Sequence, residues 1–257
     1  MANWDPTRYL RFADERSRPF VELLGRVDAA DPPRIIDLGC GPGHLTPILR
    51  ARWPHAAING VDSSPDMIAK AVADNTDPEV SYVEADLRDW VIELPVDLVV
   101  SNAALQWVPG HLEILPRLAD PVVPGGSFAF SVPGNFGEPS HRLLDELAAA
   151  EPFAAYTHDR TRPASHDAAT YLELFAGLGW SVDAWETTYL HVLTGDDPVY
   201  TWISGTGARP VLQSLPEARR DEFVRAYKAV LRAAYPPDDW GTVLPFRRNF
   251  VVARRPA

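Results

Sequence analysis

Three glycines at alternate positions follow an aspartate in the segment I-I-D-L-G-C-G-P-G, residues 35–43. The aspartate is Asp37, and the glycines are Gly39, Gly41 and Gly43. Glycines at this spacing let a backbone turn sharply and approach a ligand closely. A carboxylate beside such a loop disfavours a phosphate and suits a cationic or polyhydroxyl ligand. The segment therefore predicts a site for a cationic or polyhydroxyl small molecule.

Two phosphate-binding loops have a different spacing of glycines. A dinucleotide fingerprint, G-x-G-x-x-G, would need a third glycine at residue 44 or 46, where the sequence has His44 and Thr46. A P-loop would need a lysine close to the glycines, and this segment has none. An NAD-linked oxidoreductase is accordingly a distant alternative.

Two further acids follow the second and third predicted strands. Asp62 lies in G-V-D-S-S and Asp86 in V-E-A-D-L. Because ligands of open parallel sheets bind at the carboxyl ends of the strands, we expect both acids near the glycine loop. Asp62 can accept both hydroxyls of a ribose, and Asp86 can accept an exocyclic amine, with Leu87 against a purine face. Three acids around a glycine loop predict a site for a positively charged adenosine.

Strands alternate with helices in the first half of the chain. The apolar pattern predicts strands at residues 34–38, 57–61, 80–84, 96–101 and 127–132, the last of them after a turn at Gly125-Gly126. It predicts helices at residues 18–30, 44–53, 65–74, 110–119 and 138–150. This alternation is typical of an α/β fold with a parallel sheet that carries helices on both faces.

The second half has a longer interruption between its strands. A connection at 152–166 and a helix at 167–178 lead to a strand at 181–193, and the last strand covers 242–253. An excursion of about 45 residues between two strands is too long for a plain loop. It contains apolar residues on one helical face, namely Phe223, Tyr227, Val230, Leu231 and Ala234. We therefore expect a helical cap at residues 195–240.

The motifs of residues 34–132 resemble those of class I S-adenosylmethionine-dependent methyltransferases. The resemblance implies a doubly wound, mostly parallel seven-stranded Rossmann-like sheet, with a cofactor-binding core at 34–132 inside one domain of residues 1–257. It implies S-adenosyl-L-methionine as cofactor and S-adenosyl-L-homocysteine as product. In such enzymes the methionine part is contacted after the fourth strand, where this chain has Asn102-Ala103. The resemblance implies these cofactor-binding residues: Asp37, Gly39, Gly41, Gly43, Asp62, Ser63, Met67, Asp86, Leu87, Asn102, Ala103 and Trp107.

The flanking segments resemble the family of trans-aconitate 2-methyltransferases over nearly the whole chain, although the connection at 151–166 is not matched. The segments are W-D-P-T-R-Y-L-R-F, S-N-A-A-L-Q-W, T-T-Y-L-H, W-I-S-G-T-G-A-R-P and F-R-R-N-F-V-V-A. This resemblance implies methyl transfer to a carboxylate of trans-aconitate, which gives a monomethyl ester. We expect residues 1–30 to form a lid segment over the site.

A polycarboxylate acceptor would carry about three negative charges, which are costly to remove from water unless they are paired. The candidate substrate-binding residues are Arg209, Arg247, Tyr189, His191 and Arg16. Tyr189 and His191 alternate along one predicted strand and should face the same side. A carboxylate is already ionised near neutral pH, so we assign no general base and no other catalytic side chain. We also expect no metal.

Composition narrows the class of protein further. The chain has 257 residues and a formal net charge of −11, which disfavours a nucleic-acid partner. The residues after the fourth strand, N-A-A-L, also differ from the N/D-P-P-Y/F motif of nucleic-acid amino-methyltransferases. No apolar run approaches the roughly 20 residues of a membrane span. Cys40 is the single cysteine, so an internal disulfide framework is excluded, and we expect a cytoplasmic protein with no obligate protein partner.

Two other functions remain open from the sequence. The chain could methylate another carboxylic acid, such as a malonyl thioester on a carrier protein, and a basic docking patch would favour that function. It could also bind S-adenosylmethionine without turnover, and an occluded acceptor pocket would favour that one.

Overall fold

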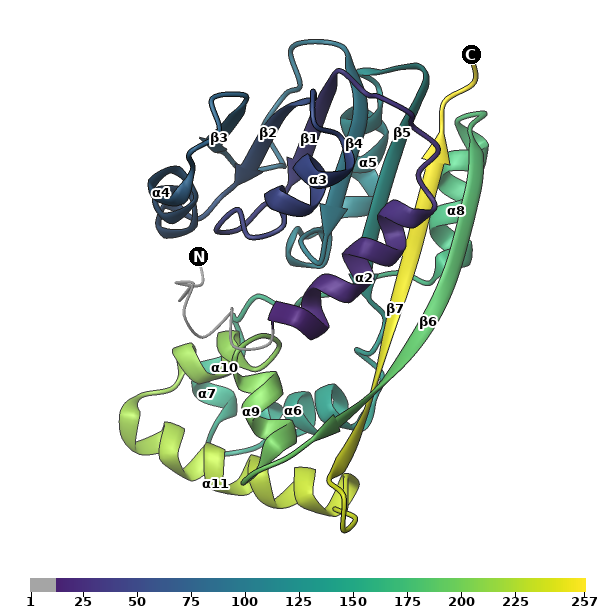
Figure 1. The fold of residues 1–257 in the computed structure, drawn as a ribbon. Coiled ribbons are helices and arrows are strands. Elements are labelled where there is room, and N and C mark those ends of the chain that lie inside the picture. The colour runs from purple at the N-terminus through teal and green to yellow at the C-terminus, as the bar shows by residue number, and fades with distance from the viewer. Residues whose placement is uncertain (1–12) are drawn as a thin grey trace. The chain divides into compact units, whose positions relative to one another are not determined.

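The computed structural model describes the backbone of residues 13–257 and the side chains from residue 17 onward. Within this part of the chain, seven strands form one sheet in the order β3-β2-β1-β4-β5-β7-β6 (Figure 1). The chain divides into a larger unit of residues 13–132, 165–186 and 249–257, and a smaller unit of residues 133–164 and 187–248. Residues 1–12 of the expected lid, and the side chain of the candidate Arg16, lie outside the described residues.

The strands of the larger unit confirm the predicted sheet. They are β1 (Arg34–Leu38), β2 (Ala57–Asp62), β3 (Val80–Glu84), β4 (Val96–Asn102) and β5 (Val122–Pro133). Each neighbouring pair among them is parallel. The order reverses at β1, which pairs with β2 on one side and β4 on the other. In an open α/β sheet this is the point where ligands bind.

Two long strands complete the sheet, β6 (Ser181–Leu193) and β7 (Thr242–Arg254). Gly125 of β5 donates its N–H to Arg255, while Gly134 donates to Arg247. Because the partner number falls as the β5 number rises, β7 runs antiparallel to β5. The sheet is therefore mixed and mostly parallel, as the expected fold class requires.

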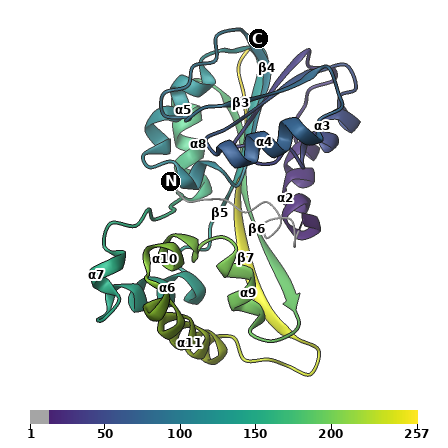
Figure 2. The same cartoon turned by 90° about the vertical axis from the view of Figure 1, so that its left-hand side faces the viewer.

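Helices cover both faces of the larger unit's strands. They are α2 (Ala13–Gly25), α3 (Thr46–Arg52), α4 (Pro65–Asp74), α5 (His111–Ala119) and α8 (Ala168–Gly177). In Figure 2, α5 and α8 lie on one side of the strands, and α2 and α3 lie on the other. Apolar side chains of α5 and α8 form one core cluster with the strands, including Leu115, Leu118, Tyr171, Phe175, Val99, Phe128 and Phe130.

Five helices belong to the smaller unit. They are α6 (Pro139–Ala149), α7 (Ala154–Thr157), α9 (Pro198–Ser204), α10 (Arg209–Ser214) and α11 (Glu217–Ala234). Phe223, Tyr227 and Leu231 of α11 are buried, which confirms the predicted apolar face of that helix. The Tyr227 hydroxyl donates to the Ser140 carbonyl over 2.6 Å, and this bond ties α11 to α6.

Two local predictions are wrong. The helix predicted at 18–30 ends at Gly25. Gly125-Gly126 is no turn, because both residues belong to β5 and exchange backbone hydrogen bonds with Arg255. Gly125 has a left-handed φ of 79°, and the pairing of β4 with β5 shifts register between Val96 and Leu98. The glycines thus form an irregular stretch inside a continuous strand.

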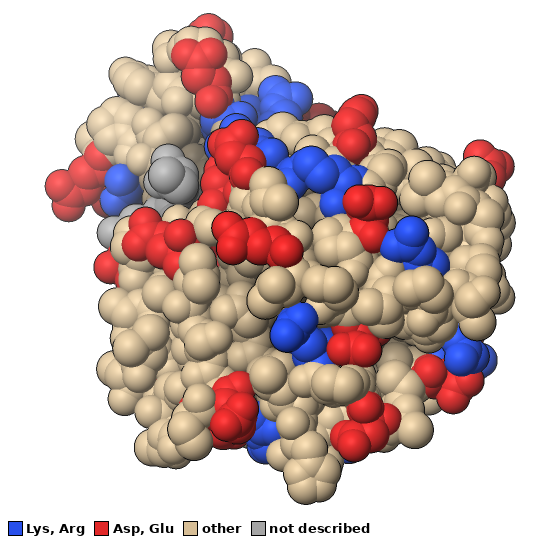
Figure 3. Space-filling model, turned by 90° about the horizontal axis from the view of Figure 1, so that it is seen from above, with Lys and Arg blue, Asp and Glu red and all other residues tan. Residues whose placement is uncertain are grey.

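Charged residues of both signs are interspersed on the face seen from above. Figure 3 shows Asp and Glu next to Lys and Arg across that face. Among residues 13–257, no helix is long and apolar enough to cross a lipid bilayer.

Candidate cofactor and acceptor sites

The glycine loop follows β1 with three left-handed residues. Gly39, Gly41 and Gly43 have φ angles of 74°, 56° and 76°. The N–H groups of Gly39 and Cys40 donate to the Val61 carbonyl over 2.7 and 3.1 Å, which anchors the loop to β2. A Cβ atom on Gly41 would meet no atom within 4 Å, so the loop is open at its centre. This conformation leaves room for a ligand directly against the backbone.

Gly39 has no such room. A Cβ atom there would lie 2.0 Å from the Ala104 Cβ, in addition to the left-handed φ. We expect Gly39→Ala to lower the free energy of unfolding by about 2–5 kcal/mol, the sum of a left-handed backbone and an overpacked contact. Urea unfolding measures this change. Gly177→Ala, where a Cβ meets nothing within 4 Å, is the matched control and should not destabilise the protein. Equal stability of Gly39→Ala and wild type would contradict this account of the loop.

Asp37, the residue before the last of β1, has a buried carboxyl group. It is 2% exposed, and its Oδ2 atom has no hydrogen-bond partner among the described residues. Burial and the neighbouring Asp62 carboxylate raise the pKa of Asp37 to about 7. A buried carboxylate without a partner is costly, and a cation removes that cost. This orphan oxygen fits a ligand with an ammonium or sulfonium group.

Asp62 binds the glycine loop through its carboxylate. Its Oδ2 accepts the Gly41 N–H and its Oδ1 accepts the Ser64 N–H, each over 2.9 Å. Burial raises the pKa of Asp62, and the nearby backbone N–H groups of Ser64, Gly41 and Ser63 oppose that rise. The two hydrogen bonds given above occupy one lone pair on each oxygen. Each carboxylate oxygen keeps a second lone pair. Asp62 can therefore hold the loop and accept the two hydroxyls of a ribose together.

The residues after Asp62 start α4. Ser63 is exposed beside the loop, while Met67 is 3% exposed and faces the core. The Ser64 hydroxyl caps the helix by accepting the Met67 N–H over 3.4 Å. Of the two candidates here, the structure leaves Ser63 accessible to a ligand and places Met67 in packing.

Asp86 has an ion-pair partner that the sequence analysis did not predict. The Arg88 guanidinium donates to both Asp86 oxygens, with Nε distances of 3.0 and 3.1 Å and an Nη2 distance of 2.6 Å. This hydrogen bonding lowers the pKa of Asp86. Leu87 is 6% exposed and belongs to the core cluster. The adenine roles of Asp86 and Leu87 stay predictions, and Asp86 would have to share its carboxylate with Arg88. The Asp-x-Arg spacing was the signal for this pair.

Asn102 and Ala103 lie where β4 ends. Asn102 Oδ1 accepts the Ser131 hydroxyl over 2.6 Å, so this amide is bound to β5. Ala103 has a left-handed φ of 56°, which is rare for a residue with a side chain, and its N–H donates to Ser131 O over 2.8 Å. Trp107, at the end of the short helix η1 (Leu105–Trp107), is half-buried. Since Ala104 adjoins Gly39, this segment and the glycine loop share one edge of the sheet.

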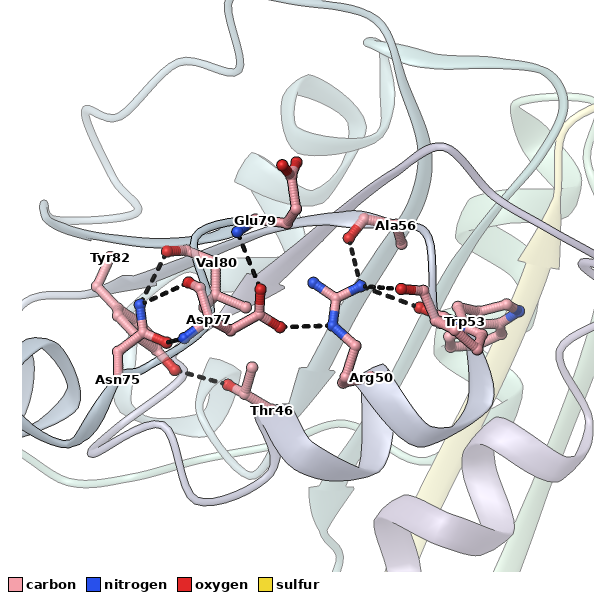
Figure 4. A network of polar contacts seen from close by, with 10 residues as sticks. Thr46, Arg50, Trp53, Ala56, Asn75, Asp77, Glu79, Val80 and Tyr82 are labelled. Carbon is pink, nitrogen blue, oxygen red and sulfur yellow. Dashed lines mark hydrogen bonds and ion pairs between the residues drawn. The ribbon is translucent and has the colours of Figure 1, made fainter.

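Side chains behind the glycine loop fix its position. The Tyr82 hydroxyl donates to Thr46 Oγ1 over 2.9 Å, and a Cβ atom on Gly43 would lie 2.5 Å from that hydroxyl (Figure 4). Nearby, Arg50 Nε donates to Asp77 Oδ2 over 2.6 Å. These bonds connect α3 both to β3 and to the segment that precedes β3. Tyr82 is a supporting residue that an isolated tyrosine in a strand does not reveal in the sequence.

The candidate acceptor residues described here belong to the smaller unit. Arg209 is the first residue of α10 and is half-buried. Arg247 is also half-buried, and its Nε donates to the Gly134 carbonyl over 2.9 Å. The rings of Tyr189 and His191 stack with centroids 6.2 Å apart, which confirms that they face the same side of β6. The His191 ring also lies 4.5 Å from Trp202, so this histidine is part of an aromatic cluster.

The chain matches known proteins over most of its length. Residues 9–184 match the family model described as "Methyltransferase domain". A trans-aconitate 2-methyltransferase of Streptomyces avermitilis is 51% identical over 99% of this chain and 98% of the relative. Proteins with the same name from Methylobacterium nodulans and Mycobacterium tuberculosis are 47% and 46% identical, over 99% and 97% of this chain and 99% and 96% of theirs.

Solved structures agree on the fold. An S-adenosylmethionine-dependent methyltransferase from Mesorhizobium loti has a TM-score of 0.55 and 20% identity, covering 95% of this chain and 99% of its own. A putative methyltransferase from Bacillus halodurans has a TM-score of 0.58 and 14% identity, and the match covers 93% of this chain and 100% of that one. The sheet order, the glycine loop and these likenesses agree with one another. The chain therefore belongs to the methyltransferase-domain family and, within it, to the group of the trans-aconitate 2-methyltransferases.

Proposed function

We propose that this protein transfers the methyl group of S-adenosylmethionine to a carboxylate oxygen of trans-aconitate, giving its monomethyl ester. The observation that carries the proposal is the likeness to relatives named trans-aconitate 2-methyltransferase. That likeness extends over 97–99% of the chain, through the segments that hold Arg209 and Arg247 as well as the glycine loop. A likeness limited to the glycine loop would support the identity of the cofactor but not that of the acceptor.

The larger unit supplies the residues that fit the cofactor. The orphan Oδ2 of Asp37 suits the positive charge, and the open backbone at Gly41 gives the ligand close access. Asp62 has acceptor capacity left for the ribose hydroxyls. When bound, S-adenosylmethionine supplies an electrophilic methyl group on a positively charged sulfur. We assign these three residues to holding it.

The acceptor needs cationic partners and no proton transfer. Its carboxylates are ionised near pH 7, so the attacking oxygen carries its lone pair without help from a base. Arg209 and Arg247 would pair with the carboxylates that do not react, which lowers the cost of taking them out of water. Holding the acceptor in line with the methyl group can supply roughly 7–11 kcal/mol of the barrier reduction. Catalysis then rests on alignment and charge pairing.

The pKa of Asp37 predicts how cofactor binding depends on pH. Its value of about 7 in the free protein means that the carboxyl is largely protonated at pH 6 and ionised at pH 8. A cation binds the ionised form, so affinity should be highest above pH 7 and fall by up to about tenfold per pH unit below it. Calorimetry with S-adenosylmethionine from pH 6 to 8 measures this dependence. Asp37→Asn serves as reference, because it lacks the carboxyl group. Any change of its affinity with pH then comes from titration of other groups, chiefly those of the ligand. Identical profiles for both proteins would contradict the assignment.

A panel of acceptors tests the proposed function. The protein is incubated with methyl-labelled S-adenosylmethionine and, in separate samples, with dicarboxylates, tricarboxylates and a malonyl thioester on a carrier protein. We expect label in a base-labile ester of trans-aconitate. Label on the carrier protein, or no label with any acid, would overturn the proposal.

A further inference from the structure

Asn135 connects β5 to α6 and has a side chain that the fold leaves without partners. It is 0% exposed, and within the described residues neither its Oδ1 nor its Nδ2 forms a hydrogen bond. Its backbone carbonyl accepts the Glu138 N–H over 3.1 Å, a role that any residue type fulfils. Buried amides are nearly always hydrogen-bonded in native proteins, so an orphan one needs an explanation. A bound ligand with acceptor or donor groups would provide it.

His141, in the first turn of α6, is a second polar residue with an unused atom. It is 8% exposed, and its Nδ1 lies 3.1 Å from the hydroxyl oxygen of Ser140. Ser140 is fully buried, so its hydroxyl satisfies its own donor by donating to Nδ1, which leaves Nε2 as the protonated nitrogen. Burial lowers the pKa of His141 to about 4. The ring is therefore a neutral N–H donor near pH 7.

Gly207 packs against the Nε2 edge of that ring. A Cβ atom on Gly207 would lie 2.7 Å from His141 Nε2. The φ of Gly207 is not in the left-handed region, so space beside the imidazole, and not backbone geometry, is what a side chain would violate. The Phe136 ring, 5.2 Å away at 81°, holds the imidazole from another side. The structure thus fixes the ring between Gly207 and Phe136, and among the described residues its hydrogen bond is formed by Nδ1 and not by Nε2.

Chain neighbours connect both residues to the candidate arginines inside the smaller unit. Gly134, directly before Asn135, donates its N–H to Arg247 O and accepts Arg247 Nε, each over 2.9 Å. Gly207, which adjoins His141, lies two residues before Arg209. Asn135 and His141 therefore lie on the segment after β5 and the first turn of α6, which contact the first half of β7, with Arg247, and the residues just before α10, with Arg209.

We propose that Asn135 and His141 bind the acceptor, an inference that rests on the proposed function. Each side chain donates a hydrogen bond to a carboxylate of the tricarboxylate. The same carboxylates pair with Arg209 and Arg247. A guanidinium that binds a carboxylate in a bidentate pair fills two of its roughly four acceptor sites, so sites remain for other donors. Neutral donors fill those sites without adding positive charge. They also position the acceptor, because each bond fixes one oxygen.

Calorimetry of acceptor binding tests this role independently of turnover. Trans-aconitate is titrated into the full chain with S-adenosylhomocysteine present, for wild type, Asn135→Leu, His141→Leu and His141→Gln. We expect both leucine variants to raise the Kd for trans-aconitate at least about tenfold, the loss typical of a hydrogen bond to a charged group. His141→Gln, which keeps an N–H donor, should recover part of the affinity. The Kd for S-adenosylhomocysteine should stay within about twofold of wild type.

Thermal unfolding separates binding from packing. Asn135→Leu should keep or raise the Tm, because an apolar group of similar size replaces an unpaired buried amide. The control is Thr157→Val in the same unit, which removes the hydroxyl that donates to Ala148 O over 2.6 Å. This control should lower the Tm and leave the Kd for trans-aconitate unchanged.

The outcomes distinguish this inference from the proposed function. If wild type methylates trans-aconitate while both leucine variants bind it with the wild-type Kd, the inference is wrong and the proposed function stands. If wild type neither binds nor methylates any tricarboxylate, the proposed function is wrong and the inference falls with it. Should His141→Leu not fold, the Kd of Asn135→Leu decides alone.

Discussion

Replacing Asp62 with alanine is expected to weaken the binding of S-adenosylhomocysteine by at least about 100-fold. The carboxylate is assigned to both ribose hydroxyls, and two hydrogen bonds to a charged group contribute about 3–6 kcal/mol together. The variant also loses the bond from Gly41 N–H to Asp62 Oδ2, which shapes the glycine loop. Calorimetry measures the affinity, with Asp66→Ala, an exposed acid at the start of α4, as the matched control.

A ribose analogue separates the two contributions of Asp62. In wild type, removal of a ribose hydroxyl from S-adenosylhomocysteine should cost affinity. In Asp62→Ala the intact and deoxygenated ligands should bind equally, because the acceptor of that hydroxyl is gone. Near-native affinity of the alanine variant would remove Asp62 from the ribose role.

Arg209→Ala should lower kcat/KM for the acceptor by about 30-fold or more and leave cofactor affinity unchanged. A buried charge left without its partner typically costs 2–5 kcal/mol, and the acceptor's carboxylate would lose its cation in this variant. Arg209 is half-buried at the first turn of α10, and an unchanged Tm of the variant shows that the kinetic effect does not come from unfolding.

Steady-state kinetics with trans-aconitate measure the Arg209 effect. Arg225→Ala, an exposed arginine on α11, removes the same charge elsewhere in the smaller unit and should retain wild-type kinetics. Unchanged kcat and KM in Arg209→Ala would refute the assignment of that residue to the acceptor.

The regular elements could be predicted because local sequence determines them. The bounds predicted for β1, α4 and β6, namely 34–38, 65–74 and 181–193, match the structure. The turn predicted at Gly125-Gly126 was wrong because pairing with Arg255, at the other end of the chain, keeps the glycines in a strand. Long-range pairing of that kind leaves no local signal.

The acids and glycines of the site could be predicted from the sequence. The side chains that contact them could not. Asp37, Asp62 and the glycine loop meet because parallel strands end at one edge of a sheet. The guanidinium on Asp86, the Tyr82 hydroxyl behind Gly43 and the burial of Asn135 follow from tertiary packing. Residue type alone did not separate these side chains from ordinary surface and core residues.

The identity of the reaction product decides whether the chain esterifies trans-aconitate. Mass spectrometry of a reaction with S-adenosylmethionine and trans-aconitate should show the monomethyl ester and an equal amount of S-adenosylhomocysteine. The kcat/KM for trans-aconitate should exceed that for citrate and for simple dicarboxylates. If the protein binds the cofactor but trans-aconitate stays unmodified after prolonged incubation, the proposed methyl transfer is contradicted.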